Sequence, residues 1–169
     1  MIQYFAYGSN INLEYLRSWL DGRGDAASEL RTPQRAILHD YELRTNFYSC
    51  THAAGACTIE PAIGEAVEGL LIQVDDHVRK ALRAKEGWPH AYTEYEVQIS
   101  IAKHERPLRA MTYIVVPELR LPCDLPVTPE YRQLILTAAK EHRFSQTYQR
   151  SLERILHPVA ISRPIEVAS

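Results

Sequence analysis

Tyr4-Phe5-Ala6-Tyr7-Gly8-Ser9-Asn10 stands near the start of the chain, and this stretch decides the fold. Its aromatic residues, with the β-branched residue before them, predict a strand over 2–7. The strand stops at a glycine followed by two residue types that cap helices. Apolar residues at helical spacing then predict a helix over 13–20. Strand, tight turn and helix therefore follow one another, and the first N–H groups of such a helix have no intrahelical acceptor.

Hydrophobic patterns beyond this turn predict the remaining elements. Strands are expected at 36–43, 56–59, 66–74, 95–101 and 111–116, the last two as a hairpin. A helix is expected from Asp75 or Asp76 to about Glu86, because an aspartate is a favoured N-cap. Two more helices are expected after Thr128-Pro129 and over 145–156. The pattern indicates an α+β domain with five or six strands, many of them antiparallel.

Composition limits the classes of protein to consider. The 169 residues include 46% hydrophobic side chains, which suits one domain, and we expect it to span 1–158 with 159–169 as a C-terminal arm or tail. Nineteen basic and 21 acidic residues give a net charge of -2, so nucleic-acid binding is not expected. No apolar run reaches the roughly 20 residues that span a bilayer, and the start lacks the features of a signal peptide. Three cysteines suit a reducing compartment, so we expect a cytoplasmic protein without a membrane partner.

The common metal and cofactor motifs are missing from the sequence. Cys50, His52 and Cys57 lie close together, but their spacing fits no common zinc pattern. No nucleophile elbow, phosphate-binding loop or dinucleotide fingerprint is present. We therefore expect neither a metal nor a cofactor.

Two features suit catalysis without a cofactor. The amides of Gly8-Ser9-Asn10 are placed to bind a carboxylate or a developing oxyanion, although an ordinary capped turn has the same sequence. Glu86 precedes Gly87 at the end of a predicted helix, where the helix dipole disfavours ionisation of a carboxylate. Such a carboxylate is a better general base near neutral pH. The alternative is a solvent-facing Glu86 paired with Lys80 or Arg83.

The ordered combination of these motifs resembles the γ-glutamylcyclotransferase family, which has an AIG2-like fold. The similarity covers about 2–157 and includes 55–59, 64–69, Thr128-Pro129-Glu130-Tyr131 and Tyr148-Gln149. The resemblance implies a small mixed, largely antiparallel β-barrel with flanking helices and a C-terminal helix pair. It also implies cyclisation of a γ-glutamyl group to 5-oxoproline, with release of the attached amino acid or amine and no cofactor.

The resemblance also assigns the site residues by position. Glu86 is the expected proton acceptor and donor. The expected substrate-binding residues are Tyr7, Gly8, Ser9, Asn10, Ile11, Asn12, Tyr92, Tyr113 and Tyr131. The run Leu82-Arg83-Ala84-Lys85 departs from the acidic run of many relatives, which bears on the leaving half of the substrate. Ser9-Asn10 after Tyr7-Gly8 is similar to the γ-glutamyl-amino-acid type.

These residues imply a small-molecule γ-glutamyl substrate and a monomer or homodimer. Two other functions remain open at this point. One is a non-catalytic module that binds γ-glutamyl metabolites. The other is a related cyclotransferase that removes a γ-glutamyl protecting group from a biosynthetic intermediate.

Overall fold

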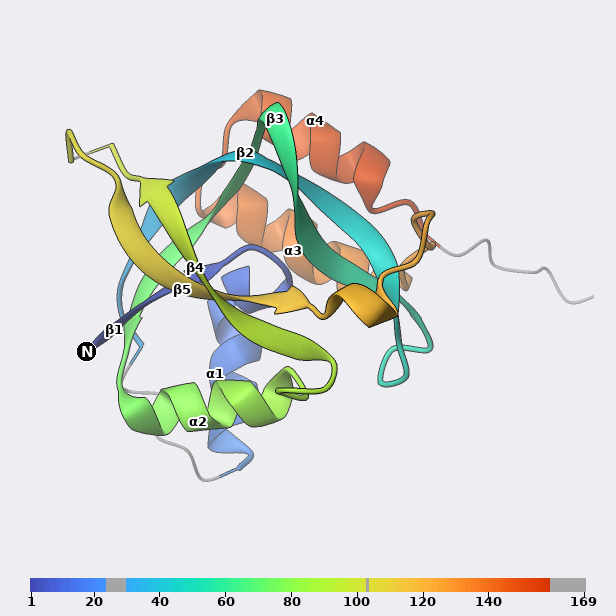
Figure 1. Ribbon diagram of the computed structural model, residues 1–169, viewed down its shortest axis with the longest axis horizontal. Coiled ribbons are helices and arrows are strands. Elements are labelled where there is room, and N and C mark those ends of the chain that lie inside the picture. Colours follow the sequence, from blue (N-terminus) through green and yellow to red (C-terminus); the bar gives the residue numbers. More distant parts are fainter. Residues whose placement is uncertain (24–29, 103, 159–169) are drawn as a thin grey trace, which may run out of the picture.

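A computed structural model describes residues 1–23, 30–102 and 104–158, in which five strands close into a barrel and four α-helices pack around it (Figure 1). In chain order the elements are β1 (Ile2–Ala6), the 3-10 helix η1 (Ser9–Ile11), α1 (Leu13–Asp21), β2 (Arg31–Ser49), β3 (Ala54–Val74), α2 (Asp76–Lys85), β4 (Tyr92–Ser100), β5 (Leu108–Val115), the 3-10 helix η3 (Pro117–Leu119), α3 (Pro129–Glu141) and α4 (Gln146–Ile155).

The barrel has the strand order β1-β3-β2-β4-β5. β1 pairs antiparallel with β3 and parallel with β5, which closes the barrel through the pair Tyr4 and Met111. The other neighbours are antiparallel. The α+β class, the mixed barrel and the C-terminal helix pair predicted from the sequence are confirmed. The predicted arm at 159–169 lies outside the described residues.

β2 and β3 form one long hairpin, in which β3 continues where the sequence predicted two separate strands. Pro61 and Gly64 interrupt the apolar pattern there and predict a break. In the structure the strand continues, and the pairing register shifts: His39 pairs with Ala66, whereas Tyr41 pairs with Pro61. Gly64 donates its amide to Asp40 Oδ1 at 2.9 Å, so the extra residues bulge outward without ending the strand.

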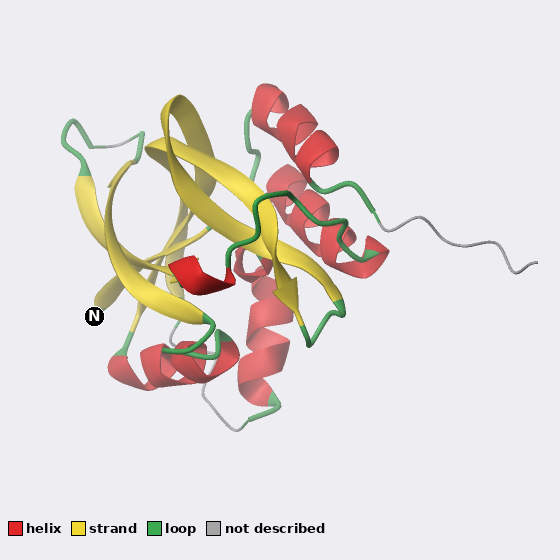
Figure 2. Ribbon diagram, turned by 45° about the vertical axis from the view of Figure 1, so that its right-hand side comes forward, coloured by secondary structure: helices red, strands yellow, loops and turns green. Residues whose placement is uncertain are grey.

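Each α-helix begins at a side-chain cap, as predicted for Asp75 and Thr128, whereas the cap of α1 is Asn12 rather than Ser9 or Asn10. Each cap oxygen accepts a hydrogen bond from the amide three residues later: Asn12 from Tyr15 at 3.0 Å, Asp75 from Val78 at 2.8 Å, Thr128 from Tyr131 at 3.1 Å and Ser145 from Tyr148 at 3.1 Å. α1 and α2 lie at one end of the barrel, while α3 and α4 pack side by side on its flank (Figure 2). Of the helices in the described ranges, none has the length and apolarity needed to span a membrane.

Gly69 allows β1 to lie against β3 at the barrel core. A Cβ atom at this position would stand 2.3 Å from the carbonyl oxygen of Ala6 and 2.6 Å from the ring of Phe5, which is fully buried. No side chain fits at that distance without moving backbone. The close approach fixes the end of β1, and with it the turn that follows.

Candidate active site

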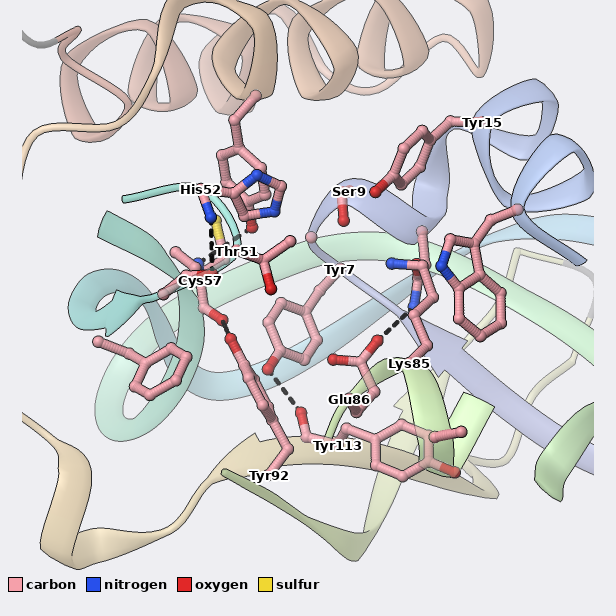
Figure 3. Close-up of a pocket in the computed structure, with 18 of the residues that line it drawn as sticks. Tyr7, Ser9, Tyr15, Thr51, His52, Cys57, Lys85, Glu86, Tyr92 and Tyr113 are labelled. Carbon is pink, nitrogen blue, oxygen red and sulfur yellow. Dashed lines mark hydrogen bonds between the residues drawn. The ribbon is translucent and has the colours of Figure 1, made fainter. Parts of the chain in front are cut away.

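A cavity of about 280 Å³ opens beside the turn that follows β1 (Figure 3). The turn forms one wall, and the C-terminal end of α2 forms another. Residues of all five strands, of the turn between β2 and β3, and of α1 and α3 complete the lining. Of the residues expected from the sequence, the cavity brings together Tyr7, Gly8, Ser9, Asn10, Glu86, Tyr92, Tyr113 and Tyr131.

Ile11 and Asn12, also expected at the substrate, lie outside this lining. The side chain of Ile11 is fully buried in the hydrophobic core. The side-chain Oδ1 of Asn12 caps α1, and its Nδ2 donates to the backbone oxygen of Leu134 at 3.3 Å. Both residues therefore support the turn from behind, joining it to α1 and α3.

Glu86 is the C-cap residue directly after α2 and faces the turn across the cavity. Its amide closes the last helical turn by donating to Leu82 at 2.9 Å, and Gly87, with φ of +64°, takes the chain out of the helix. The Nδ2 of Asn10 donates to Glu86 Oε1 at 2.8 Å and to the hydroxyl of Tyr4 at 2.8 Å. A carboxylate from α2 is thus joined to the first strand and its turn.

The buried side chain of Asn10 also presents an acceptor. Its Oδ1 accepts no hydrogen bond from any described residue, although Asn10 is only 5% exposed. A buried amide oxygen without a partner is costly, so the contacts of the Asn10 side chain with Glu86 and Tyr4 are maintained at the expense of this atom. The amides of Ser9 and Asn10, at the start of η1, likewise have no intrahelical acceptor.

Two arginines of α2 hold the helix against β4 through one carboxylate. Glu94 accepts from Arg79 at 2.6 and 2.8 Å and from Arg83 at 2.7 and 2.9 Å. The hydrogen bonds of Arg79, followed by those of Arg83, lower the pKa of Glu94 from 4.5 to about 2, against the opposing effect of burial. Tyr113 donates to the same carboxylate at 3.2 Å. We call Arg79, Arg83 and Glu94 the α2 clamp. Arg83 therefore pairs with Glu94 and not with Glu86, the alternative considered from the sequence.

A register shift in the hairpin places two phenols at the cavity. The shift falls between Arg44 and Phe47 of β2, opposite the part of β3 that contains Cys57. The amide of Cys57 donates to the hydroxyl of Tyr131 at 3.1 Å, and its carbonyl accepts from the hydroxyl of Tyr92 at 2.8 Å. The backbone groups of Cys57 thus hold both phenols, which come from α3 and β4.

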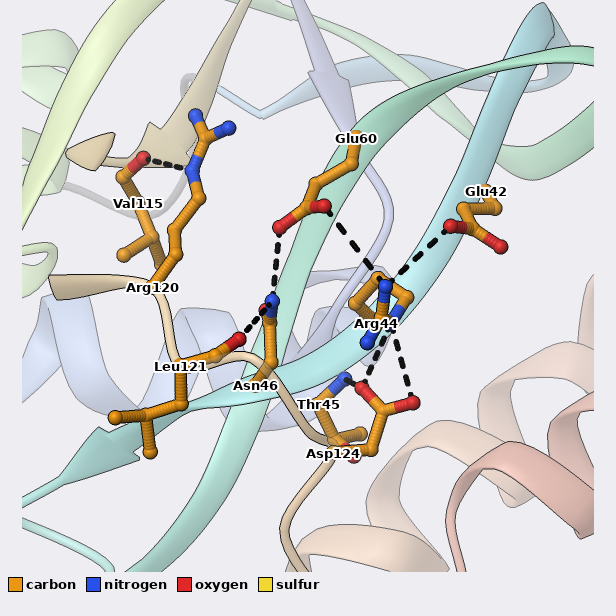
Figure 4. Close-up of polar contacts among 9 residues, drawn as sticks. All are labelled: Glu42, Arg44, Thr45, Asn46, Glu60, Val115, Arg120, Leu121 and Asp124. Carbon is orange, nitrogen blue, oxygen red and sulfur yellow. Dashed lines mark hydrogen bonds and ion pairs between the residues drawn. The ribbon is translucent and has the colours of Figure 1, made fainter. Parts of the chain in front are cut away.

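The segment after β5 covers the same register shift from the β2 side (Figure 4). Thr45 donates its amide to Asp124 at 2.8 Å and accepts from the amide of Leu125 at 3.1 Å. Asn46 accepts from the amide of Leu121 at 2.7 Å. The backbone that the shift releases from the ladder is therefore hydrogen-bonded on both strands, which makes this wall of the cavity firm.

Burial keeps the tyrosines of the cavity protonated. Burial first, and the charge of Glu86 second, raise the pKa of Tyr4 and of Tyr7 well above 10. Burial also raises the pKa of Tyr131. These phenols act at neutral pH as hydrogen-bonding groups rather than bases; Tyr7 donates to the carbonyl of Tyr113 at 2.5 Å.

The thiol in the cavity is not a nucleophile at neutral pH. Burial raises the pKa of Cys57 to about 12, and only the thiolate attacks carbon. Within the described ranges, no three His, Cys, Asp or Glu side chains come together as a metal site. The polar groups of the lining include one carboxylate, the ammonium of Lys85, the imidazole of His52 and several phenols.

The sequence did not identify eleven residues of the lining: Tyr4, Tyr15, Trp19, Phe47, Ser49, Thr51, His52, Ala56, Cys57, Ala84 and Lys85. Two local signals were present. Tyr15 and Trp19 are four residues apart on α1, so they share a helical face directly after the turn. Lys85 adjoins the predicted base. The others depend on how β2 and β3 fold back, which no local pattern shows.

A known protein family matches most of this chain. The family model described as gamma-glutamyl cyclotransferase, AIG2-like, matches residues 4–133. A search of the curated proteins found no match.

Solved structures share the fold at low sequence identity. A structure described as gamma-glutamyl cyclotransferase is 22% identical, with a TM-score of 0.76, and the match covers 98% of this chain and 94% of that one. An uncharacterized human protein is also 22% identical, with a TM-score of 0.77 and the same coverage. A yeast gamma-glutamyl cyclotransferase specific to glutathione is 16% identical, with a TM-score of 0.64, covering 92% of this chain and 95% of the other.

Proposed function

Because the chain belongs to the gamma-glutamyl cyclotransferase, AIG2-like family, we propose that it cyclises a γ-glutamyl group to 5-oxoproline with Glu86 as general base and acid. One observation carries the assignment of Glu86. Its Oε1 accepts from Asn10 at 2.8 Å, so the carboxylate lies inside the cavity and beside the turn after β1. A carboxylate that faced bulk solvent would not contact the buried side chain of Asn10.

The first step is removal of a proton from the substrate. The α-amine of a γ-glutamyl compound is protonated near pH 7 and becomes a nucleophile only after a base deprotonates it. Glu86 takes that proton, and its hydrogen bond from Asn10 holds the carboxylate at one point of the cavity.

Ring closure follows within the bound molecule. The α-nitrogen attacks the γ-carbonyl carbon, giving a tetrahedral intermediate with its charge on the carbonyl oxygen. Orientation of an intramolecular attack supplies up to about 7–11 kcal/mol, so the protein mainly folds the substrate into the reactive geometry. The amides of Ser9 and Asn10 and the hydroxyls of Tyr4 and Tyr131, which accept hydrogen bonds from Asn10 and Cys57, are the donors for the developing oxyanion or the α-carboxylate.

The leaving group departs with a proton. Protonated Glu86 gives its first proton to the leaving nitrogen while the old C–N bond breaks, and the carboxylate then takes a further proton from the nitrogen of the new lactam. The lactam keeps one N–H, and Glu86 passes the second proton to the released amine. The carboxylate of Glu86 is regenerated, and no covalent enzyme intermediate is needed.

Replacement of Glu86 tests the assignment. In Glu86→Gln an oxygen remains to accept the Asn10 bond, but the base is lost, so 5-oxoproline formation from γ-glutamyl dipeptides is expected to fall by about 10²–10⁴-fold. Glu153→Gln, on the exposed surface of α4, is the matched control and should keep the wild-type rate. Thermal melts of all three proteins show whether each is folded.

Two outcomes would contradict the proposal. A wild-type rate in Glu86→Gln removes Glu86 from the chemistry. A wild-type protein that is stabilised thermally by γ-glutamyl compounds, but releases no 5-oxoproline from dipeptides or from larger γ-glutamylated amines, is a binding module instead. Preference for the larger amines over dipeptides identifies a deprotecting enzyme.

A further inference from the structure

A lysine stands at the mouth of the cavity beside the proposed base. Lys85 is the last residue of α2, lines the cavity, and directly precedes Glu86. Its Nζ lies 4.9 Å from the ring centroid of Tyr15 and 5.8 Å from that of Trp19. Both rings come from one face of α1, so the two helices meet at this ammonium (Figure 3).

The ring contacts position the charge of Lys85 without neutralising it. Among the described residues, no carboxylate oxygen lies within 4.0 Å of its Nζ, whereas Arg79 and Arg83 of the same helix are both paired with Glu94. The faces of aromatic rings attract an ammonium, but they do not accept its N–H groups as the oxygens of a carboxylate do. Lys85 therefore retains its capacity to bind an anion.

The charge of Lys85 acts across the cavity. On the opposite wall, His52 lies over the ring of Tyr131 with the centroids 4.9 Å apart. Burial, and then the positive charge of Lys85, lower the pKa of His52, so the imidazole is neutral at pH 7. Of the basic side chains in the lining, Lys85 is thus the one that carries the positive charge.

Exposure divides the cavity into two ends. Tyr4, Tyr7 and Tyr131 are buried at the closed end, whereas Tyr15 and Lys85 are partly exposed at the mouth. The γ-glutamyl group is common to every substrate of the proposed reaction, so it belongs at the closed end, among fixed polar groups. The leaving group has to depart into solvent and therefore lies toward the mouth.

We propose that the ammonium of Lys85, held between Tyr15 and Trp19, binds a carboxylate of the leaving group. The inference rests on the proposed function. It makes Lys85 a specificity residue for γ-glutamyl amino acids and peptides with a free carboxylate near the scissile amide. γ-Glutamylamines bring no such anion, and those with a second ammonium are repelled by Lys85.

A pair of isosteric substrates tests this assignment. γ-Glutamyl-L-alanine and γ-glutamyl-L-alaninamide differ only in the charge of the leaving group. We expect the wild-type kcat/KM for the carboxylate to exceed that for the amide by about tenfold or more, as for a hydrogen bond to a charged group. Lys85→Ala should reduce this ratio to near one, while Lys85→Arg should largely retain it. Lys80→Ala, exposed on the same helix and outside the lining, is the matched control and should keep the ratio.

The outcomes separate the inference from the proposed function. If the wild type cyclises both substrates at equal kcat/KM, or if Lys85→Ala lowers both equally, Lys85 does not recognise the leaving group and the inference is wrong while the function stands. If the wild type forms 5-oxoproline from neither substrate, the proposed function itself fails. A preference for the carboxylate substrate that declines with added NaCl supports an ionic contact at the partly exposed mouth.

Discussion

Replacement of Glu94 by glutamine is expected to loosen α2 and to change how stability depends on pH. The substitution keeps the size of the side chain but removes the charge that two guanidinium groups share. Because the pKa of Glu94 falls from 4.5 to about 2 on folding, its ionisation stabilises the folded state. That contribution is complete above the unfolded-state pKa and is lost as the pH falls from about 4.5 toward 2.

The pKa shift of Glu94 sets an upper limit on the unfolding free energy that Glu94→Gln removes. At about 1.4 kcal/mol for each pKa unit, the change from 4.5 to about 2 corresponds to about 3 kcal/mol of unfolding free energy at pH 7. The Glu94 side chain is 14% exposed, but its partners Arg79 and Arg83 are 32% and 31% exposed, so solvent screens the pairs. We therefore expect Glu94→Gln to cost about 1–2 kcal/mol at neutral pH.

Urea denaturation from pH 7 to pH 3, followed by circular dichroism, measures this difference. Glu96→Gln is the control, because Glu96 on the same strand meets Arg109 only at 3.7 Å with both side chains largely exposed. Its effect should stay within about 0.5 kcal/mol. The gap between wild type and Glu94→Gln should narrow on acidification, by roughly half at pH 3. A gap that is the same at every pH would refute the electrostatic account of the α2 clamp.

Two further substitutions test the packing and the cavity wall. Gly69→Ala places a methyl group 2.3 Å from the backbone oxygen of Ala6 and is expected to lower the unfolding free energy by about 1–3 kcal/mol in urea titrations; wild-type stability would contradict the close approach. Tyr131→Phe leaves the buried amide of Cys57 without its acceptor, which costs about 1–3 kcal/mol in thermal melts, and it is expected to lower kcat/KM. Unchanged kinetics would remove Tyr131 from the substrate site.

The parts of the fold that short-range chemistry decides could be predicted from the sequence. Asn, Asp, Thr and Ser caps stand at the starts of the helices, and alternation of apolar residues located the β4–β5 hairpin. The single long strand β3 could not be predicted, because Pro61 and Gly64 are residues that usually end strands. Gly64 donates its amide to the side chain of Asp40 on the paired strand, a contact between residues 24 positions apart in sequence.

The candidate site shows the same division. Glu86 and the turn after β1 were recognisable as separate motifs, but the hydrogen bond between Asn10 and Glu86 joins residues 76 positions apart. The place of Cys57 depends on a register shift in β2, and local propensity carries no information about register. The environment of Lys85 also depends on the meeting of two helices, so no sequence pattern predicts its ring contacts.

The α2 clamp explains how so distant a carboxylate reaches the turn reproducibly. Arg79 and Arg83 are four residues apart and lie on one face of α2, so a single bridging carboxylate fixes the helix at two points. Both contacts end on one side chain of β4, and together with the buried residues Val78, Ala81 and Leu82 they set the rotation of α2. Glu86 follows three residues later, and its orientation toward Asn10 is therefore determined by β4 as much as by its own contact.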